Sequence, residues 1–166
     1  MRVVLFDRGD TLEHNGALLP GVIELLFAVQ GMRDARRRPV ESALVSDYYP
    51  AANAADIARL RAEYLESLGR LGIARFFEPY PRRVTLSSDS TDPEFVKPSP
   101  RIFRAALDKL CPGLPFGCAL FLTENGEHIR AARALGMTGV HFHGPGQTGG
   151  ELGRLVDLIP ILHRWL

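Results

Sequence analysis

The residues best suited to chemistry stand at the end of the first apolar run of the sequence. The run Val3-Val4-Leu5-Phe6 leads directly into Asp7, and Gly9 and Asp10 follow at once. Four apolar residues of this kind are typical of a strand buried on both faces of a parallel sheet. Ligands in such folds bind beyond the carboxyl ends of the strands. Asp7 is therefore a candidate catalytic carboxylate, although Asp and Gly also favour ordinary turns.

Alternating strand and helix patterns predict the framework that would position Asp7. We expect strands at 3–6, 42–46, 82–87, 118–122 and 139–143, and helices at 20–29, 51–71, 102–110, 127–135 and 155–165. The segment 13–17 reads as a polar loop, and Pro160 is expected to kink the last helix. Strands that alternate with helices predict a doubly wound α/β fold with a mostly parallel five-stranded sheet, formed by residues 1–166 as one domain.

The composition excludes several classes of protein. Lys and Arg number 20 against 19 Asp and Glu, so a net charge of +1 gives no general attraction to nucleic acid or acidic membranes. No apolar run reaches the roughly 18 residues of a membrane span, and no secretory segment is recognisable. Cys111 and Cys118 lack the spacing of a zinc site or a disulfide framework. These features predict a soluble protein of the reducing cytoplasm.

The segment Asp7-Arg8-Gly9-Asp10-Thr11-Leu12 resembles the first signature of the haloacid dehalogenase-like superfamily, Asp-x-Asp-Gly-Thr-Leu. Asp7, Thr11 and Leu12 match, whereas Gly9 and Asp10 have exchanged places relative to the signature. The resemblance implies that Asp7 attacks phosphorus and that the second Asp of the signature protonates the leaving oxygen. We therefore expect Asp7 and Thr11 in the catalytic site, with Asp10 as a displaced substitute for the missing acid.

Two later segments resemble the second and third signatures, in the expected chain order. Residues 43–46 form an apolar run that ends in Ser46, and Lys97 opens Lys-Pro-Ser-Pro before a predicted helix. The resemblance implies that Ser46 and Lys97 are catalytic residues that hold the phosphoryl oxygens, the lysine as a compact cation. Gly9 and Asp47 are further substrate-binding candidates.

The fourth signature, which holds a magnesium ion in the superfamily, is only partly retained. Residues 121–128 lead into a helix of the expected kind, but the aspartates of the signature are absent. Magnesium uses one or two carboxylates together with water and phosphate. We therefore consider a shifted magnesium site made by Asp7, the Gly9 carbonyl and Glu124, against the alternative that no metal binds. His128 is expected to cap the helix or to face solvent.

The spacing of the signatures leaves no room for the cap modules of the superfamily. The intervals from Asp7 to Ser46 and from Ser46 to Lys97 contain only elements that the core itself needs. The resemblance then implies an open site for a phosphorylated substrate, large enough to include macromolecules, or a site covered by a second subunit of a homo-oligomer.

Three functions remain open at this stage. The leading interpretation is a phosphomonoesterase that forms an aspartyl-phosphate on Asp7. A metal-independent dehalogenase-like hydrolase is the second, because Thr123-Glu124-Asn125 resembles the Ser-x-Asn pattern of that branch. The third is a binding or scaffold protein with little catalysis, since two of the four signatures are altered.

Overall fold

The computed structural model describes residues 1–166 and is built around one five-stranded sheet. The strand order is β5-β4-β1-β6-β7, and every neighbouring pair is parallel. The strands are β1 (Val3–Phe6), β4 (Glu41–Ser46), β5 (Val84–Leu86), β6 (Ala119–Thr123) and β7 (Thr138–His141). An antiparallel hairpin of β2 (Glu13–His14) and β3 (Ala17–Leu18) stands apart from this sheet. The predicted α/β fold with five parallel strands is confirmed.

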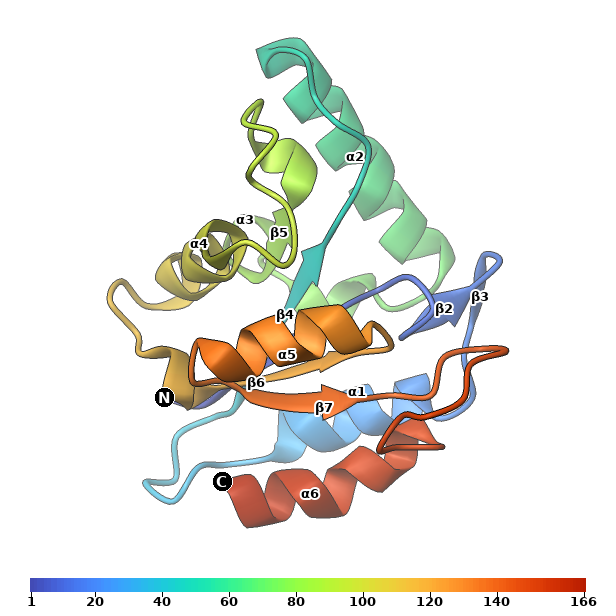
Figure 1. Ribbon diagram of the computed structural model, residues 1–166, viewed down its shortest axis with the longest axis vertical. Helices are drawn as coiled ribbons and strands as arrows, with labels where there is room; N and C mark the ends of the chain where they lie inside the picture. Colours follow the sequence, from blue (N-terminus) through green and yellow to red (C-terminus); the bar gives the residue numbers. More distant parts are fainter.

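Helices cover both faces of the sheet (Figure 1). They are α1 (Val22–Gly31), α2 (Ala54–Arg70), α3 (Tyr80–Arg83), α4 (Pro100–Leu110), α5 (Gly126–Ala134) and α6 (Leu158–Trp165), with the 3-10 turns η1 (Ala74–Phe77), η2 (Ser87–Asp89), η3 (Phe116–Cys118) and η4 (Leu155–Asp157). Val4 and Phe6 of β1 pack toward α1 and α6, whereas Val3 and Leu5 pack toward α4 and α5. This alternation explains why all four residues of β1 are apolar.

Two local predictions were wrong, and the position of Pro160 gives no support to a third. The strand expected at 82–87 is limited to β5, because Arg82 and Arg83 belong to the helical turn α3, which Pro79 precedes. The loop expected at 13–17 forms the β2–β3 hairpin, whose turn uses positive φ at Asn15 and Gly16. Pro160 lies in the first turn of α6, where its missing N–H removes no helical hydrogen bond, so it gives no reason for a kink.

The connections from β1 to β4 and from β4 to β5 contain few elements, and the absence of a cap stays a prediction. The chain from β1 to β4 contains only the hairpin and α1, and the chain from β4 to β5 contains α2, η1 and α3. In Figure 1, α2 extends past the sheet at the end where β4 stops. None of the helices combines the length and the apolar character that crossing a membrane requires.

Side-chain caps fix the starts of two helices next to the carboxyl edge of the sheet. Ser99 accepts the N–H of Arg101 at the start of α4, and Asn125 accepts the N–H groups of Glu127 and His128 at the start of α5. Such caps satisfy N–H groups that a helix leaves without partners. They also fix the two segments that deliver Lys97 and Thr123 to this edge.

Candidate active site

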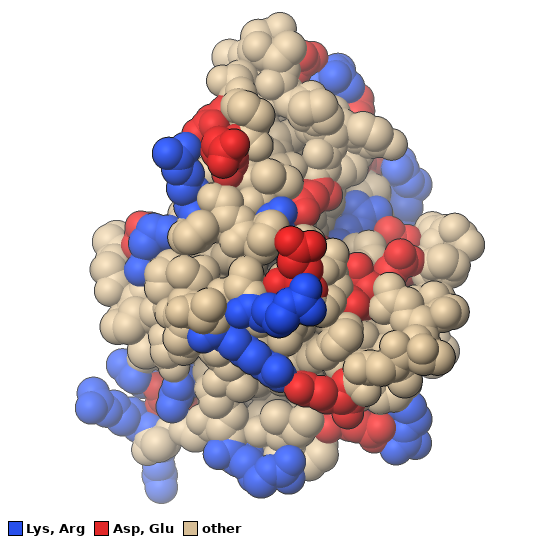
Figure 2. All heavy atoms as spheres, in the orientation of Figure 1, with Lys and Arg blue, Asp and Glu red and all other residues tan.

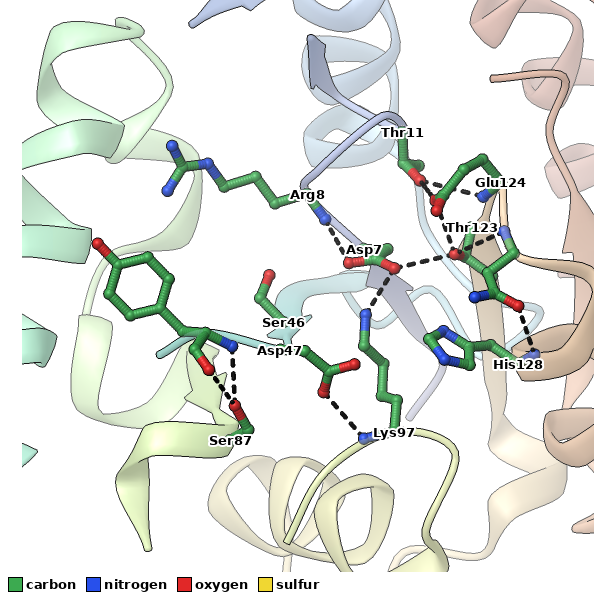
Figure 3. A network of polar contacts seen from close by, with 12 residues as sticks. Asp7, Arg8, Thr11, Ser46, Asp47, Ser87, Lys97, Thr123, Glu124 and His128 are labelled. Atoms are coloured by element: carbon green, nitrogen blue, oxygen red, sulfur yellow. Dashed lines mark hydrogen bonds and ion pairs between the residues drawn. The ribbon is translucent and has the colours of Figure 1, made fainter. Parts of the chain in front are cut away.

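Asp7 lies at the carboxyl end of the central strand β1, with only 7% of its surface exposed. Its Oδ1 accepts the backbone N–H of Arg8 at 2.8 Å. Its Oδ2 contacts the Lys97 ammonium at 2.5 Å and accepts the Thr123 hydroxyl at 2.9 Å (Figure 3). Lys97 and Thr123 come from distant parts of the chain, so the fold brings these two partners to the carboxylate.

Lys97 is buried between the neighbouring strands and the start of α4, with 6% of its surface exposed. Its backbone N–H donates to Asp47 Oδ1 at 2.9 Å, and its ammonium lies 5.9 Å from the centre of the Phe121 ring. A buried ammonium needs a counter-charge, and Asp7 supplies it. Two of the predicted site residues, Asp7 and Lys97, are thus in direct contact.

Ser46 lies at the end of β4, the strand next to β1, and is 2% exposed. Figure 3 shows it near the carboxyl end of β1, but no hydrogen bond joins its hydroxyl to Asp7 or Lys97. Its hydroxyl is 2.7 Å from the hydroxyl of Tyr64 on α2. Burial raises the pKa of Tyr64 well above its usual value, so this phenol stays protonated. The pattern that predicted a helix over 51–71 gave no indication of this contact.

A cavity of about 140 Å³ opens beside these groups, lined by Arg8, Gly9, Glu13, Ser46, Asp47, Tyr48 and Tyr64. The backbone N–H groups of Gly9 and Asp47 take part in none of the backbone hydrogen bonds. Unpaired N–H groups at a cavity are suitable donors to an anion, as in oxyanion-type sites. The cavity therefore offers two free N–H donors, whereas Asp7 and Lys97 are not among its lining residues.

Arg8 forms one wall of this cavity, and Figure 3 shows its side chain directed away from Asp7. Its Nη1 donates to Ser67 Oγ at 2.7 Å, and the guanidinium lies 4.7 Å from the centre of the Tyr64 ring. Arg8 Nε is buried without a hydrogen-bond partner, and Glu13 Oε1 is 3.7 Å from it. This arginine joins α2 to the segment that carries the candidate nucleophile.

The exchange of Gly9 and Asp10 has a visible consequence in the backbone. Asp10 has φ of 52°, whereas Gly9 is not among the residues with positive φ. The Asp10 side chain is 52% exposed, and its Oδ1 lies 2.6 Å from His14 Nδ1. The structure thus turns Asp10 toward His14 and brings it to none of the groups around Asp7. Its predicted role as a substitute acid has no geometric support.

Thr11, Thr123 and Glu124 form a second polar group on the other side of Asp7 (Figure 3). Glu124 Oε2 is 2.6 Å from Thr11 Oγ1 and 3.0 Å from Thr123 Oγ1. A hydroxyl carries one proton, so Thr123 donates either to Asp7 or to Glu124 at a given moment. Thr11 therefore supports Glu124 and does not touch Asp7. Thr123, which was not among the predicted site residues, contacts both carboxylates.

Two carboxylates lie around Thr123, and carboxylates are a donor type that magnesium uses. No three His, Cys, Asp or Glu side chains gather into a metal-binding group. Magnesium, however, commonly takes one or two carboxylates and completes its shell with water and phosphate. Asp7 and Glu124 share the Thr123 hydroxyl, and the Gly9 carbonyl accepts no backbone hydrogen bond. Asp7 and Glu124 would be the carboxylate ligands of such an ion, whereas no contact joins the Gly9 carbonyl to either of them.

His128 neither caps α5 nor faces solvent, contrary to the prediction. It is half-buried, its Nδ1 has no hydrogen-bond partner, and Figure 3 shows its ring beside Lys97. Burial, and after it the positive charge of Lys97, lower the pKa of His128. An imidazole in this place is neutral near pH 7 and adds no charge to the site.

Asn125 belongs to the segment that resembles the dehalogenase pattern, but its side chain caps a helix. Its side-chain oxygen accepts the N–H groups of Glu127 at 2.9 Å and His128 at 3.2 Å, which caps α5. No contact joins this side chain to Asp7. The geometry therefore gives no support to the dehalogenase interpretation.

Comparison with known proteins identifies the fold but no sequence family. No family model matches the chain, and no curated protein matches it in sequence. Among solved structures, D,D-heptose 1,7-bisphosphate phosphatase from B. bronchiseptica, complexed with magnesium and phosphate, is 13% identical with TM-score 0.61, over 100% of both chains. A haloacid dehalogenase-like family protein from Streptococcus pneumoniae is 12% identical with TM-score 0.62, over 98% of both chains.

A third match is a haloacid dehalogenase-like protein of unknown function from Agrobacterium tumefaciens. It is 20% identical with TM-score 0.62, over 89% of this chain and 61% of that one. At these identities the similarity concerns the fold. The protein therefore has the haloacid dehalogenase-like fold that the order of the four signatures predicted.

Proposed function

We propose that the protein hydrolyses phosphate monoesters through an aspartyl-phosphate on Asp7. One observation carries the proposal: the Asp7 carboxylate and the Lys97 ammonium form a buried pair, 2.5 Å apart, at the carboxyl edge of the sheet. Ligands bind at this edge in parallel α/β folds. A carboxylate held there beside a cation can act as a nucleophile toward phosphorus.

In the first step Asp7 Oδ1 attacks phosphorus and the bond to the leaving oxygen breaks. Oδ1 is the suitable atom because it accepts only the Arg8 N–H, whereas Oδ2 has both Lys97 and Thr123 as partners. The N–H groups of Gly9 and Asp47, with the Lys97 ammonium, stabilise the negative charge on the phosphoryl oxygens. Water then attacks phosphorus, which releases inorganic phosphate and restores the Asp7 carboxylate.

In this proposal Asp7, the Gly9 carbonyl and Glu124 would be the protein ligands of a magnesium ion. When bound, it supplies positive charge to the phosphoryl oxygens. Thr11 holds the Glu124 carboxylate through a hydrogen bond of 2.6 Å, and Thr123 adds one of 3.0 Å when its proton is not donated to Asp7. The two threonines therefore act as positioning residues for this carboxylate.

Protonation of the leaving group is the weak point of this site, because Gly9 carries no acid. A positioned general acid contributes about 10²- to 10⁴-fold to rate. Esters with good leaving groups, such as acyl phosphates and aryl phosphates, need little protonation. We therefore propose that the enzyme acts quickly on activated phosphate esters and slowly on alkyl phosphates.

Beryllium fluoride tests the nucleophile directly, because it mimics a phosphoryl group on a carboxylate. We expect fluorine NMR of the wild type with magnesium to show a bound adduct, which Asp7→Asn abolishes. Hydrolysis of acetyl phosphate by the wild type, and its loss in Asp7→Asn, is the matching activity assay. A wild type that forms no adduct and releases no phosphate would favour the scaffold interpretation.

A further inference from the structure

A second cavity lies next to the candidate active site, between the loop after β4 and the loop before α4. Its volume is about 300 Å³, and Tyr48 lines both this cavity and the one beside Gly9. Val96, another lining residue, directly precedes Lys97. Pockets for small molecules commonly start at about 300 Å³. The two neighbouring cavities thus have room for a phosphoryl group in one and a ring-sized group in the other.

The charges of the second cavity exclude an anionic occupant. No Lys, Arg or His lines it, and its one charged residue is Asp92. The Asp92 carboxylate is already paired with Arg101, 2.5 Å away, and accepts the N–H of Glu94. A second phosphate or a carboxylate would meet an acid and no cation, and a charge without a partner is unfavourable in such a place. An ammonium group would have to compete with Arg101 for Asp92.

Aromatic and apolar side chains form much of the wall of this cavity. Tyr48 is fixed edge-on against Tyr64, with ring centres 5.2 Å apart, and its backbone N–H donates to Ser87 Oγ. Phe95 and Val96 lie on the opposite loop and line the same cavity. Aromatic and apolar walls with a few hydroxyl groups are typical of sites for neutral ligands.

Exposed apolar surface is concentrated at this edge of the molecule. Only three large hydrophobic side chains are exposed, and two of them, Tyr49 at 67% and Val96 at 36%, belong to the two loops that border the cavity. In Figure 2 the uppermost part of the molecule, where Figure 1 places the start of α2, is mostly uncharged. An apolar rim beside a phosphoryl site favours a substrate with an apolar leaving group.

We propose that the leaving group of the substrate is uncharged, contains one ring and binds between Tyr48 on one side and Phe95 and Val96 on the other. This rests on the proposed function, because the first cavity must hold the phosphoryl group. The substrate class is then the monophosphate of an uncharged phenol, and bisphosphates are excluded.

Binding of non-hydrolysable phosphonates, measured by calorimetry with magnesium present, tests the subsite without any need for turnover. We expect benzylphosphonate to bind the wild type about tenfold more tightly than methylphosphonate, a difference of about 1.4 kcal/mol. Propane-1,3-bisphosphonate and 2-aminoethylphosphonate should bind no better than methylphosphonate. The proposal is overturned if either charged compound binds more tightly than benzylphosphonate, or if no phosphonate binds.

Val96→Lys supplies the missing cation and should reverse the preference. We expect about tenfold tighter binding of the bisphosphonate and weaker binding of benzylphosphonate. Ala134→Lys adds the same charge at the exposed far end of α5 and should change neither affinity. An unchanged preference in Val96→Lys would refute the subsite.

The two proposals fail in different ways. If benzylphosphonate binds as expected but beryllium fluoride forms no adduct on Asp7, the subsite stands and the phosphatase activity does not. If the adduct forms but the ring gives no gain in affinity, the phosphatase activity stands and the subsite is wrong.

Discussion

At the residue scale, the candidate site depends on one buried ion pair. The side chains of Lys97 and Asp7 are 2% and 10% exposed, and each is the nearest opposite charge of the other. Removal of one partner from a buried pair leaves an uncompensated charge, which is far more costly than removal of both. Disruption of the pair should therefore lower both the stability of the protein and its activity.

Lys97→Met should lower the free energy of unfolding by about 3–5 kcal/mol, because Asp7 would remain buried without its cation. Asp7→Asn in the same chain should recover part of this loss. Urea unfolding of both single variants and the double variant gives the coupling energy. Strictly additive losses would show that the two groups do not interact in solution.

Gly9→Asp should create the acid that the first signature lacks. A Cβ at Gly9 would meet no atom within 4 Å, so the side chain can be accommodated. We expect kcat for alkyl phosphates to rise by about 10²-fold, with little change for acyl phosphates, because only the former need a proton donor.

Gly153→Asp is the matched control for that gain, because Gly153 is exposed and its Cβ would also meet no atom within 4 Å. It adds the same charge away from the candidate site and should leave both rates unchanged. Equal gains on alkyl and acyl phosphates in Gly9→Asp would contradict a role in protonation.

At the scale of the elements, α2 is the unexpected contributor. The sequence predicted only a helix over 51–71, yet α2 brings Tyr64 to Ser46 and Ser67 to Arg8. Tyr64 is 1% exposed, so water cannot replace Ser46 as the hydrogen-bond partner of its hydroxyl. The helix thus fixes two walls of the small cavity.

Tyr64→Phe should cost about 1–3 kcal/mol, because the Ser46 hydroxyl would remain buried without its partner. Urea unfolding measures this loss of stability. The variant should also have a higher KM for acetyl phosphate, since Ser46 would be free to adopt other rotamers. Tyr80→Phe, which removes an exposed bond to Glu78, serves as the control. A Tyr64→Phe variant as stable as the wild type would argue against the Ser46 contact.

At the scale of the whole molecule, ion pairs also secure the end of the sheet opposite the site. Asp34, in the turn between α1 and β4, is 7% exposed. Its burial opposes ionisation, but the Arg38 side chain and the N–H groups of Arg38 and Arg36 outweigh this effect and lower the pKa of Asp34 to about 2. The ionised carboxylate is therefore the form that the folded protein stabilises.

Asp34 should make the stability depend on pH in the acid range. Its pKa in the folded protein lies below the unfolded value of about 3.9, so its contribution is complete above about pH 4 and disappears as the pH falls toward 2. Asp34→Asn should flatten the loss of stability across this window, as measured by urea unfolding at successive pH values. Glu94→Gln, at an exposed carboxylate, should retain the wild-type slope.

Local patterns in the sequence were sufficient for the framework and for two of the site residues. The apolar run before Asp7 and the helix that follows Lys97 are features of single segments, so periodicity and motif order identified them. The α/β fold follows from the same alternation. The hairpin at 13–18 was not predicted because each of its strands has only two residues and shows no periodicity.

Contacts between segments distant in the chain could not be derived in this way. The Ser46–Tyr64 bond, the Thr123 hydroxyl shared by two carboxylates, and the orientation of Asp10 toward His14 each depend on how packed elements meet. A residue type and its position in a motif limit which bonds a side chain is able to form. Which of those bonds exists is set by burial, since only packing decides which polar partner lies within reach and which is replaced by water.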